Sequence, residues 1–146
     1  MEKRRKKALV EIQELFNAIN KNVALDWAHH DETGLSLSHV CILEMLASEG
    51  AKRPSDLAEM LQITTGGITS LSHRLTEGSL VKKVSNEKDR RAILLEVTEK
   101  GKDVLKQALG QRENMMDRLF GSLSDTDIDY LKQIGYSLLH QDKQSN

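Results

Sequence analysis

The sequence predicts a mainly helical fold with one small β-hairpin near its middle. Apolar residues recur every three or four positions through long segments at both ends of the chain, which is the period of amphipathic helices. In the middle, two short helical segments are joined by three residues, and two β-branched runs flank a charged stretch. With 146 residues, 38% of them hydrophobic, the chain is long enough for one packed domain with appended helices.

The first expected helix covers about residues 4–29. Its apolar residues are spaced as one stripe: Ile12, Leu15, Phe16, Ile19, Val23 and Trp27. The polar segment 31–34 ends this helix, and Ser36 is expected to cap a second helix that reaches Gly50. The second helix has a denser apolar pattern, so we expect it to be buried on one side.

Two shorter helices are expected next. Pro54 interrupts the chain, and Ser55 is expected to cap a helix of about two turns. After a connection of three residues, which ends in the N-cap Thr64, a further helix is predicted over residues 65–78. The inner face of that helix is formed by Ile68, Leu71 and Leu75. Two helices joined in this way form a helix-turn-helix.

A β-hairpin is expected over residues 80–97, because β-branched runs flank the polar stretch 85–91. The remaining chain has helical periodicity again. Thr98 is expected to cap a long helix and Ser124 the last one, in whose first turn Asp127 suits the helix dipole.

Composition excludes several classes of protein. Residues 52–102 hold ten Lys and Arg against seven carboxylates while the rest of the chain is acidic, so a polyanion would approach this middle segment. The few aromatic residues cannot form a stacking platform for single-stranded nucleic acid. No apolar run approaches a membrane span, so we expect a cytoplasmic protein without membrane contact. Cys41 is the single cysteine, and no spacing matches a catalytic motif, so we expect no disulfide, catalytic residue, metal or cofactor.

Several short motifs follow one another in the middle segment. They are Pro54-Ser55-Asp56-Leu57-Ala58-Glu59-Met60-Leu61, Ile63-Thr64-Thr65-Gly66-Gly67-Ile68-Thr69, His73-Arg74-Leu75, Leu80-Val81, Asp89-Arg90-Arg91 and Leu95-Glu96-Val97-Thr98-Glu99-Lys100-Gly101. Over about residues 35–103 this pattern resembles the winged helix-turn-helix of the MarR family of bacterial transcriptional regulators. Gln62 stands where the family's turn usually has Gly, and a left-handed conformation at a non-Gly residue costs about 1 kcal/mol.

The resemblance implies a winged helix-turn-helix at 35–98 between dimerisation helices at 1–34 and 99–146. It implies a homodimer that binds double-stranded DNA at a pseudo-palindromic operator. It further implies regulation by a ligand or oxidant at the junction of the two parts, and we expect a repressor that a small-molecule effector releases. The recognition helix, about 65–78, would enter the major groove, and the wing, about 80–97, would enter the minor groove.

The candidate DNA-binding residues lie on the polar side of the recognition helix and in the wing. A helix N-terminus reaches base edges, and its free amides suit a phosphate. The helix contributes Thr64, Thr65, Gly66, Thr69, Ser70, His73 and Arg74, and the wing contributes Lys88, Arg90 and Arg91. Arg91 would enter a narrow minor groove, and Asp89 would orient it through a charge-assisted pair. Lys82 and Lys83 would contact phosphates.

Two other interpretations remain open. A metal- or redox-responsive regulator would use His29, His30, His39 and Cys41, although Cys41 also fits the second helix as a small core residue. A helical adaptor that binds a protein through residues 99–146 would explain the long terminal helices but not the cationic hairpin. DNA binding that weakens steeply with salt would separate the DNA-binding regulator from the adaptor.

Overall fold

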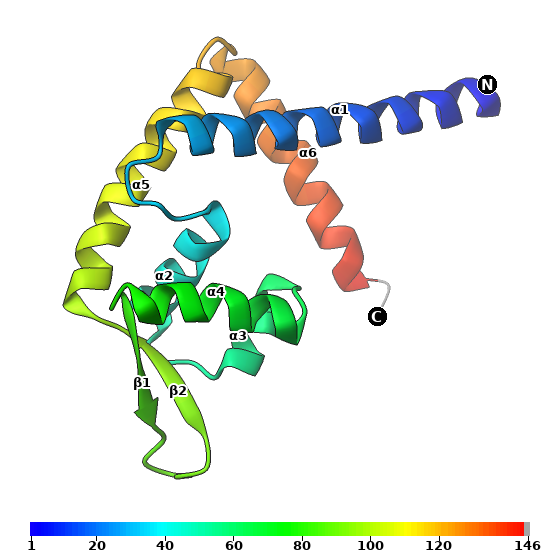
Figure 1. Cartoon of the computed structure of the whole chain (residues 1–146). Coiled ribbons are helices and arrows are strands. Elements are labelled where there is room, and N and C mark those ends of the chain that lie inside the picture. Colours follow the sequence, from blue (N-terminus) through cyan, green and yellow to red (C-terminus); the bar gives the residue numbers. More distant parts are fainter. Residues whose placement is uncertain (145–146) are drawn as a thin grey trace. The chain divides into compact units, whose positions relative to one another are not determined.

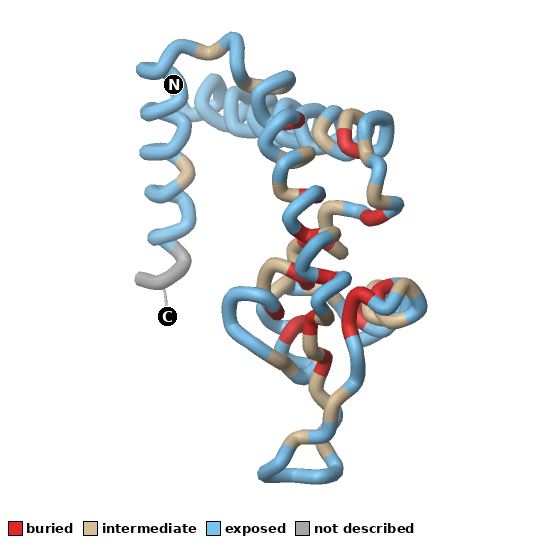
Figure 2. The backbone as a smooth tube through the Cα atoms, turned by 90° about the vertical axis from the view of Figure 1, so that its left-hand side faces the viewer, coloured by how far each residue is buried: buried red, intermediate tan, exposed pale blue. Residues whose placement is uncertain are grey.

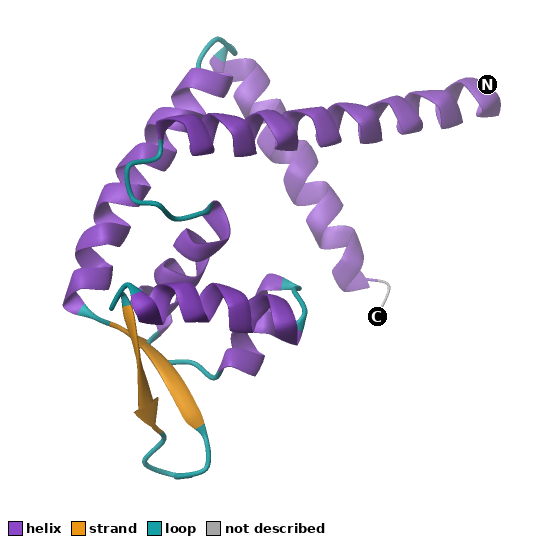
Figure 3. Cartoon of the chain, in the orientation of Figure 1, coloured by secondary structure: helices purple, strands orange, loops and turns teal. Residues whose placement is uncertain are grey.

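The computed structural model describes residues 1–144, with side-chain surroundings as far as residue 141. Within that range it has six helices and one antiparallel hairpin (Figures 1 and 3). The chain forms two compact parts, Met1–Arg112 and Glu113–Asn146, which are described separately. The functional boundaries expected after residues 34 and 98 stay predictions.

The first part begins with the long helix α1 (Glu2–His30), followed by a loop and by α2 (Leu37–Glu49). Asp31 organises the loop, because its carboxylate accepts hydrogen bonds from the backbone N–H groups of Thr33, Gly34 and Leu35. Ser36 caps α2, which confirms the prediction. Its Oγ accepts from the N–H of His39 at 3.3 Å, and His39 Nδ1 accepts from the N–H of Ser36 at 2.9 Å.

The helix-turn-helix consists of α3 (Pro54–Leu61) and α4 (Thr65–Glu77). The expectation that Ser55 caps α3 is wrong: Arg53 is the N-cap and Pro54 is the first helical residue. Proline suits that position because it lacks the N–H that would otherwise stay unpaired. Thr64 caps α4 as predicted, with Oγ1 accepting from the N–H of Gly67 at 3.0 Å. Gln62 takes the left-handed conformation with φ 54°, so the turn keeps its geometry without glycine.

The wing is formed by β1 (Val81–Ser85) and β2 (Ile93–Val97), each beginning one residue later than predicted. The register places Val81 opposite Val97 and Ser85 opposite Ile93. A further pairing was not indicated by the sequence: Lys52 and Leu95 exchange two backbone hydrogen bonds, of 3.0 and 2.8 Å. The base of the wing is therefore held on both sides of β2.

Helix α5 (Glu99–Phe120) begins close to the wing. Thr98 caps it as predicted, with Oγ1 accepting from the N–H of Gly101 at 2.9 Å and donating to Ser79 O at 2.7 Å. A Cβ on Gly101 would lie 2.1 Å from Leu80 O, so only glycine allows this close approach. Later in α5, Arg112 pairs with Glu44 of α2 through both of its terminal nitrogens, at 2.8 and 3.3 Å.

The second part contains the end of α5 and α6 (Asp125–Gln144). Ser124 caps α6 as predicted, because its Oγ accepts from the N–H of Asp127 at 3.1 Å. Among the described residues, no helix is both long and apolar enough to cross a membrane.

The core lies in the helix-turn-helix, the wing and α2, where Figure 2 shows most of the buried backbone. The largest side chains with less than 2% exposure are Val40, Ile42, Leu43, Leu46, Leu57, Ile68, Leu75, Leu95 and, in α5, Met115. From α1 only Trp27 is buried, and its indole N–H donates to Leu35 O at 2.6 Å. The apolar stripe earlier in α1 is exposed within this single chain.

Candidate nucleic-acid interface

Helix α4 presents one polar face to solvent. Ile68 and Leu75 are buried and Leu71 is partly buried, as the sequence predicts for the inner face. The opposite face is exposed over all seven residues predicted for DNA contact: Thr64, Thr65, Gly66, Thr69, Ser70, His73 and Arg74. The structure therefore brings these candidates together along one side of one helix.

The first turn of this face is free of bulky side chains. A Cβ on Gly66 would meet nothing nearer than Thr64 Oγ1 at 4.0 Å, so packing does not require glycine there. Glycine in a helix costs roughly 1 kcal/mol relative to alanine. The residue therefore leaves the backbone open to an approaching molecule at a cost to the helix.

Near the other end of the face, two side chains have partners within the protein. His73 Nε2 lies 3.1 Å from Glu77 Oε1, one turn further along α4. Arg74 reaches Gly34 and Gly78: its Nη2 and Nη1 are each 3.3 Å from the position that a Cβ on these glycines would take. The guanidinium of Arg74 thus lies beside both glycines.

The wing tip is an exposed cationic turn. Lys88, Arg90 and Arg91 are all exposed. Two side chains shape the turn: Asn86 Oδ1 accepts from the N–H of Lys88 at 3.1 Å, and Asp89 Oδ1 accepts from the N–H of Arg91 at 3.1 Å. The contribution of Asn86 was missed, although Asn is typical of such side-chain-to-backbone turns.

The contact between Asp89 and Arg91 differs from the expected one. The carboxylate binds the backbone N–H of Arg91, and the described residues include no ion pair between the two side chains. The physical reason is local: a short Asp side chain reaches the amide two residues ahead more readily than a guanidinium that extends into solvent. Asp89 therefore positions Arg91 through the backbone.

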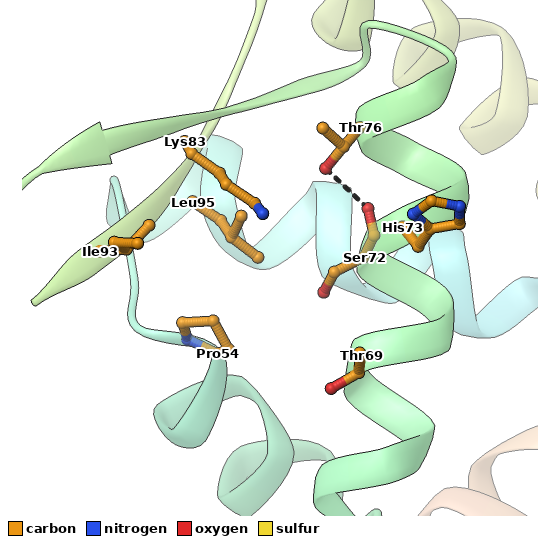
Figure 4. Close-up of a pocket in the computed structure, with 8 residues that line it drawn as sticks. All are labelled: Pro54, Thr69, Ser72, His73, Thr76, Lys83, Ile93 and Leu95. Atoms are coloured by element: carbon orange, nitrogen blue, oxygen red, sulfur yellow. Dashed lines mark hydrogen bonds between the residues drawn. The ribbon is translucent and has the colours of Figure 1, made fainter.

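The two lysines of β1 lie on opposite faces of the wing. Lys82 pairs across the strands with Glu96, at 3.4 Å from Nζ to Oε1. Lys83 is also exposed, and its side chain lines a cavity between α4 and the wing (Figure 4). The period of two in a strand explains why the two side chains point to different faces.

The cavity has a volume of about 290 Å³ and is lined by both polar and apolar groups. Its lining residues are Pro54, Thr69, Ser72, His73, Thr76, Lys83, Ile93 and Leu95. Figure 4 shows the Lys83 side chain extending from the strand toward α4. Ser72 Oγ is buried and has no hydrogen-bond partner among the described residues. The space therefore offers the ammonium group of Lys83 to a small polar molecule, with Ser72 Oγ buried in its wall.

The residues of the metal or redox alternative are not gathered in one place. His29 and His30 contact each other edge to face, and His30 Nδ1 lies 3.0 Å from Asp26 O. His39 caps α2, and Cys41 is half-buried in the same helix. Over the described part of the chain, no three His, Cys, Asp or Glu side chains form a group that could hold a metal ion.

Comparison with known proteins finds transcriptional regulators of one family. The MarR family model matches residues 33–92. The HTH-type transcriptional repressor MdtR of Bacillus subtilis is 24% identical over 119 residues, which cover 82% of this chain and 75% of MdtR. Among solved structures, a mutant MarR from E. coli complexed with operator DNA has a TM-score of 0.80 at 16% identity, covering 90% of this chain and 96% of that one.

A second solved structure concerns BpsR of Bordetella bronchiseptica and the regulation of its DNA binding by 6-hydroxynicotinic acid. It has a TM-score of 0.74 at 19% identity and covers 86% of this chain and 90% of that chain. These similarities agree with the helix-turn-helix, the wing and the order of the elements described above. The chain is therefore similar to MarR-family transcriptional regulators and shares their winged-helix fold.

Proposed function

We propose that this protein is a homodimeric repressor that binds a pseudo-palindromic operator in double-stranded DNA and is released by a small-molecule effector. The observation that carries the proposal is the exposed polar face of α4 together with the cationic wing tip of the same domain. A helix of this kind fits the major groove, and arginines fit a narrow minor groove. Thr64, Thr65, Gly66, Thr69, Ser70 and His73 would contact DNA from α4, and Lys88, Arg90 and Arg91 from the wing.

Gly66 supports the assignment of α4 as the recognition helix. Because no packing contact requires glycine at this position, its benefit has to come from something outside the fold. A bare backbone next to the free amides of the first turn would let a DNA phosphate approach closely. Of these amides, the side chain of Thr64 accepts a hydrogen bond from that of Gly67 alone.

The terminal helices support a dimer. Every residue of α1 before Val23 is exposed, and so is almost all of α6 through residue 141, apolar residues included. Most of the stability of a helix in a protein comes from packing of its apolar face, so a second copy would cover these stripes. A dimer also supplies two recognition helices at a fixed spacing, as two half-sites require.

The effector proposal is supported by the cavity between α4 and the wing. BpsR, whose DNA binding is regulated by 6-hydroxynicotinic acid, is similar in fold. In this chain, a small acid would find the ammonium of Lys83 in that cavity. A ligand wedged there would change the angle between the recognition helix and the wing, which have to enter two grooves at once.

Operator titrations at two salt concentrations test the proposal. Arg91→Ala should weaken binding by about 1–3 kcal/mol and make the salt slope shallower by roughly one unit for each wing. Away from the flank that the wing contacts, the order of affinities over a panel of half-site mutants should be unchanged. Thr69→Ala or Ser70→Ala should instead reorder the panel, because these side chains face base edges.

Lys21→Ala, which removes an exposed cation from α1, is the matched control and should bind like the wild type. An Arg91→Ala variant with wild-type affinity and salt slope would mean that the wing is a solvated hairpin. Binding that does not change with salt would reject DNA recognition by this domain altogether.

A further inference from the structure

Arg74 differs from the other residues on the exposed face of α4. It lies in the last turn of the helix, and its guanidinium spans two glycines: Nη2 lies next to Gly34 and Nη1 next to Gly78, each at 3.3 Å from the Cβ position of that residue. No carboxylate among the described residues lies within ion-pair distance of it. The planar group therefore lies beside two glycines and has no carboxylate partner among the described residues.

The surface that Arg74 meets is a well-ordered loop. Besides the three hydrogen bonds to the Asp31 carboxylate, the carbonyl of Leu35 accepts from the buried indole of Trp27. Gly34 itself has φ +73°, a conformation that favours glycine, and its N–H is one of those bound by Asp31. The loop joins α1 to α2, so contact with it connects the recognition helix to the N-terminal helix of the chain.

The positive charge of Arg74 also reaches the imidazole of His39. Burial lowers the pKa of its imidazole below the usual value of 6.5, and the positive charge of Arg74 lowers it further. The same imidazole caps α2 through Nδ1, which accepts from the N–H of Ser36. Arg74 thus acts on the first turn of α2 as well as on the loop.

We propose that Arg74 is a positioning residue, which docks the C-terminal end of the recognition helix onto loop 31–36 and so sets the angle at which α4 is presented to DNA. This inference rests on the proposed DNA binding. The guanidinium suits the task because its flat, forked group can lie against two backbones at once, which a single ammonium cannot. Gly34 and Gly78 suit it because neither has a Cβ in the space that the fork occupies.

The first test compares Arg74→Gln with the wild type on a panel of half-site mutants at two salt concentrations. A positioning role predicts weaker binding to every member, on the order of tenfold, with the same rank order and salt slope. A reordered panel would overturn the inference in favour of base reading. A slope shallower by about one unit per half-site would overturn it in favour of a phosphate contact.

The second test follows the imidazole of His39 by NMR titration of the full chain. In Arg74→Gln the pKa of His39 should rise, because a positive charge has been removed from its surroundings. Arg74→Lys keeps the charge but not the fork, so it should retain the lowered pKa without recovering the affinity. Full recovery of affinity by lysine would show that charge alone matters and would overturn the inference.

A third comparison leaves Arg74 in place and moves its guanidinium. Gly78 has φ −77°, so Gly78→Ala is free of backbone strain, and the new Cβ would crowd Nη1. It should weaken binding as Arg74→Gln does and have no further effect in the double variant. Gly110→Ala, where nothing lies within 4 Å, is the control and should bind like the wild type.

If the wild type bound no member of the panel, the DNA-binding proposal would fail. The NMR titration of His39 would still test whether Arg74 lies against loop 31–36. An unchanged His39 pKa in Arg74→Gln would then overturn the docking of Arg74 on the loop.

Discussion

The winged helix-turn-helix and the terminal helices have the same kind of apolar periodicity but opposite burial. The winged helix-turn-helix, expected at residues 35–98, is called the central domain. Leu43 and Ile68 of the central domain are 0% exposed, whereas Phe16 of α1 is 52% exposed and so is Leu131 of α6. The periodicity of a helix determines which of its faces is apolar. It does not determine whether the same chain covers that face, and this difference is what motivates the proposal that a second copy covers the terminal helices.

The largest effect is expected from charges placed on the apolar stripe of α6. The double variant Leu131→Asp and Ile134→Asp should separate the dimer, because two carboxylates would be buried in its interface. Operator affinity should fall by roughly 100-fold or more, since the two half-sites are no longer bound by one linked unit. Sedimentation velocity and operator titration measure the two effects.

The control for this experiment is Gln133→Ala, at a polar position of the same helix, which should leave assembly unchanged. A charged variant that sediments as a monomer and still binds the operator at full strength would contradict the comparison, since the central domain would then be sufficient.

A pair of glycines in α5 tests where the central domain ends. Gly101→Ala would place a Cβ 2.1 Å from Leu80 O and 2.8 Å from Val97 Cγ2, so the helix has to shift, and the loss should be about 1–3 kcal/mol. Gly110→Ala has open space and should stabilise the helix by up to about 1 kcal/mol. Thermal unfolding at a fixed protein concentration measures the stability of both variants. Equal changes in stability would mean that Gly101 does not pack closely against Leu80.

A smaller change in stability is expected from a substitution in the turn between α3 and α4. Gln62 has φ 54°, which is unfavourable for a residue with a Cβ. Gln62→Gly should therefore raise the free energy of unfolding by up to about 1 kcal/mol without changing operator affinity. Gln62→Ala is the control and should give no such gain. If alanine stabilised as much as glycine, backbone strain would not be the cause.

The smallest effect is a pH dependence from His39. The pKa of His39 is lowered in the folded chain. As pH falls below 6.5, the unfolded chain therefore binds more protons than the folded chain does. This contribution to stability is complete above pH 6.5 and is lost as pH falls through the folded pKa. Denaturant unfolding should show a steeper loss at acid pH for the wild type than for His39→Gln, since Gln keeps the acceptor of the capping box without titrating.

His140→Gln is the matched control for this experiment, because His140 is exposed on α6. That variant should follow the wild-type curve. Identical pH dependence in the wild type and His39→Gln would show that the cap does not titrate over this range.

Most elements of the central domain followed from local chemistry. Ser36, Thr64, Thr98 and Ser124 each cap the helix that they were predicted to cap, because a side chain three residues from an unpaired amide satisfies it without help from the rest of the fold. The error at Ser55 is equally local, since Pro54 starts its helix one residue earlier.

The sequence was enough to predict which residues of the candidate site lie on the exposed surface. It was not enough to predict the contacts that these residues make within the protein. Helical periodicity placed all seven residues of α4 on the exposed side, and the Asp89-Arg90-Arg91 motif placed the cations at the wing tip. The orientation of Lys83 depended on the exact register of β1, which the sequence indicated only to within one residue. The role of Asp89 depended on which of two nearby donors its carboxylate reached.

Local patterns in the sequence were enough to predict the helix-turn-helix, the hairpin, most of the caps and the polar face of α4, because each depends on residues that are close together in the chain. Three other features could be seen only in the folded chain: the pairing of Lys52 with Leu95, the close approach of Gly101 to Leu80 and the position of Arg74 beside Gly34. These contacts join residues about 20 to 43 positions apart. Their geometry follows from the packing of whole elements, which no local pattern encodes.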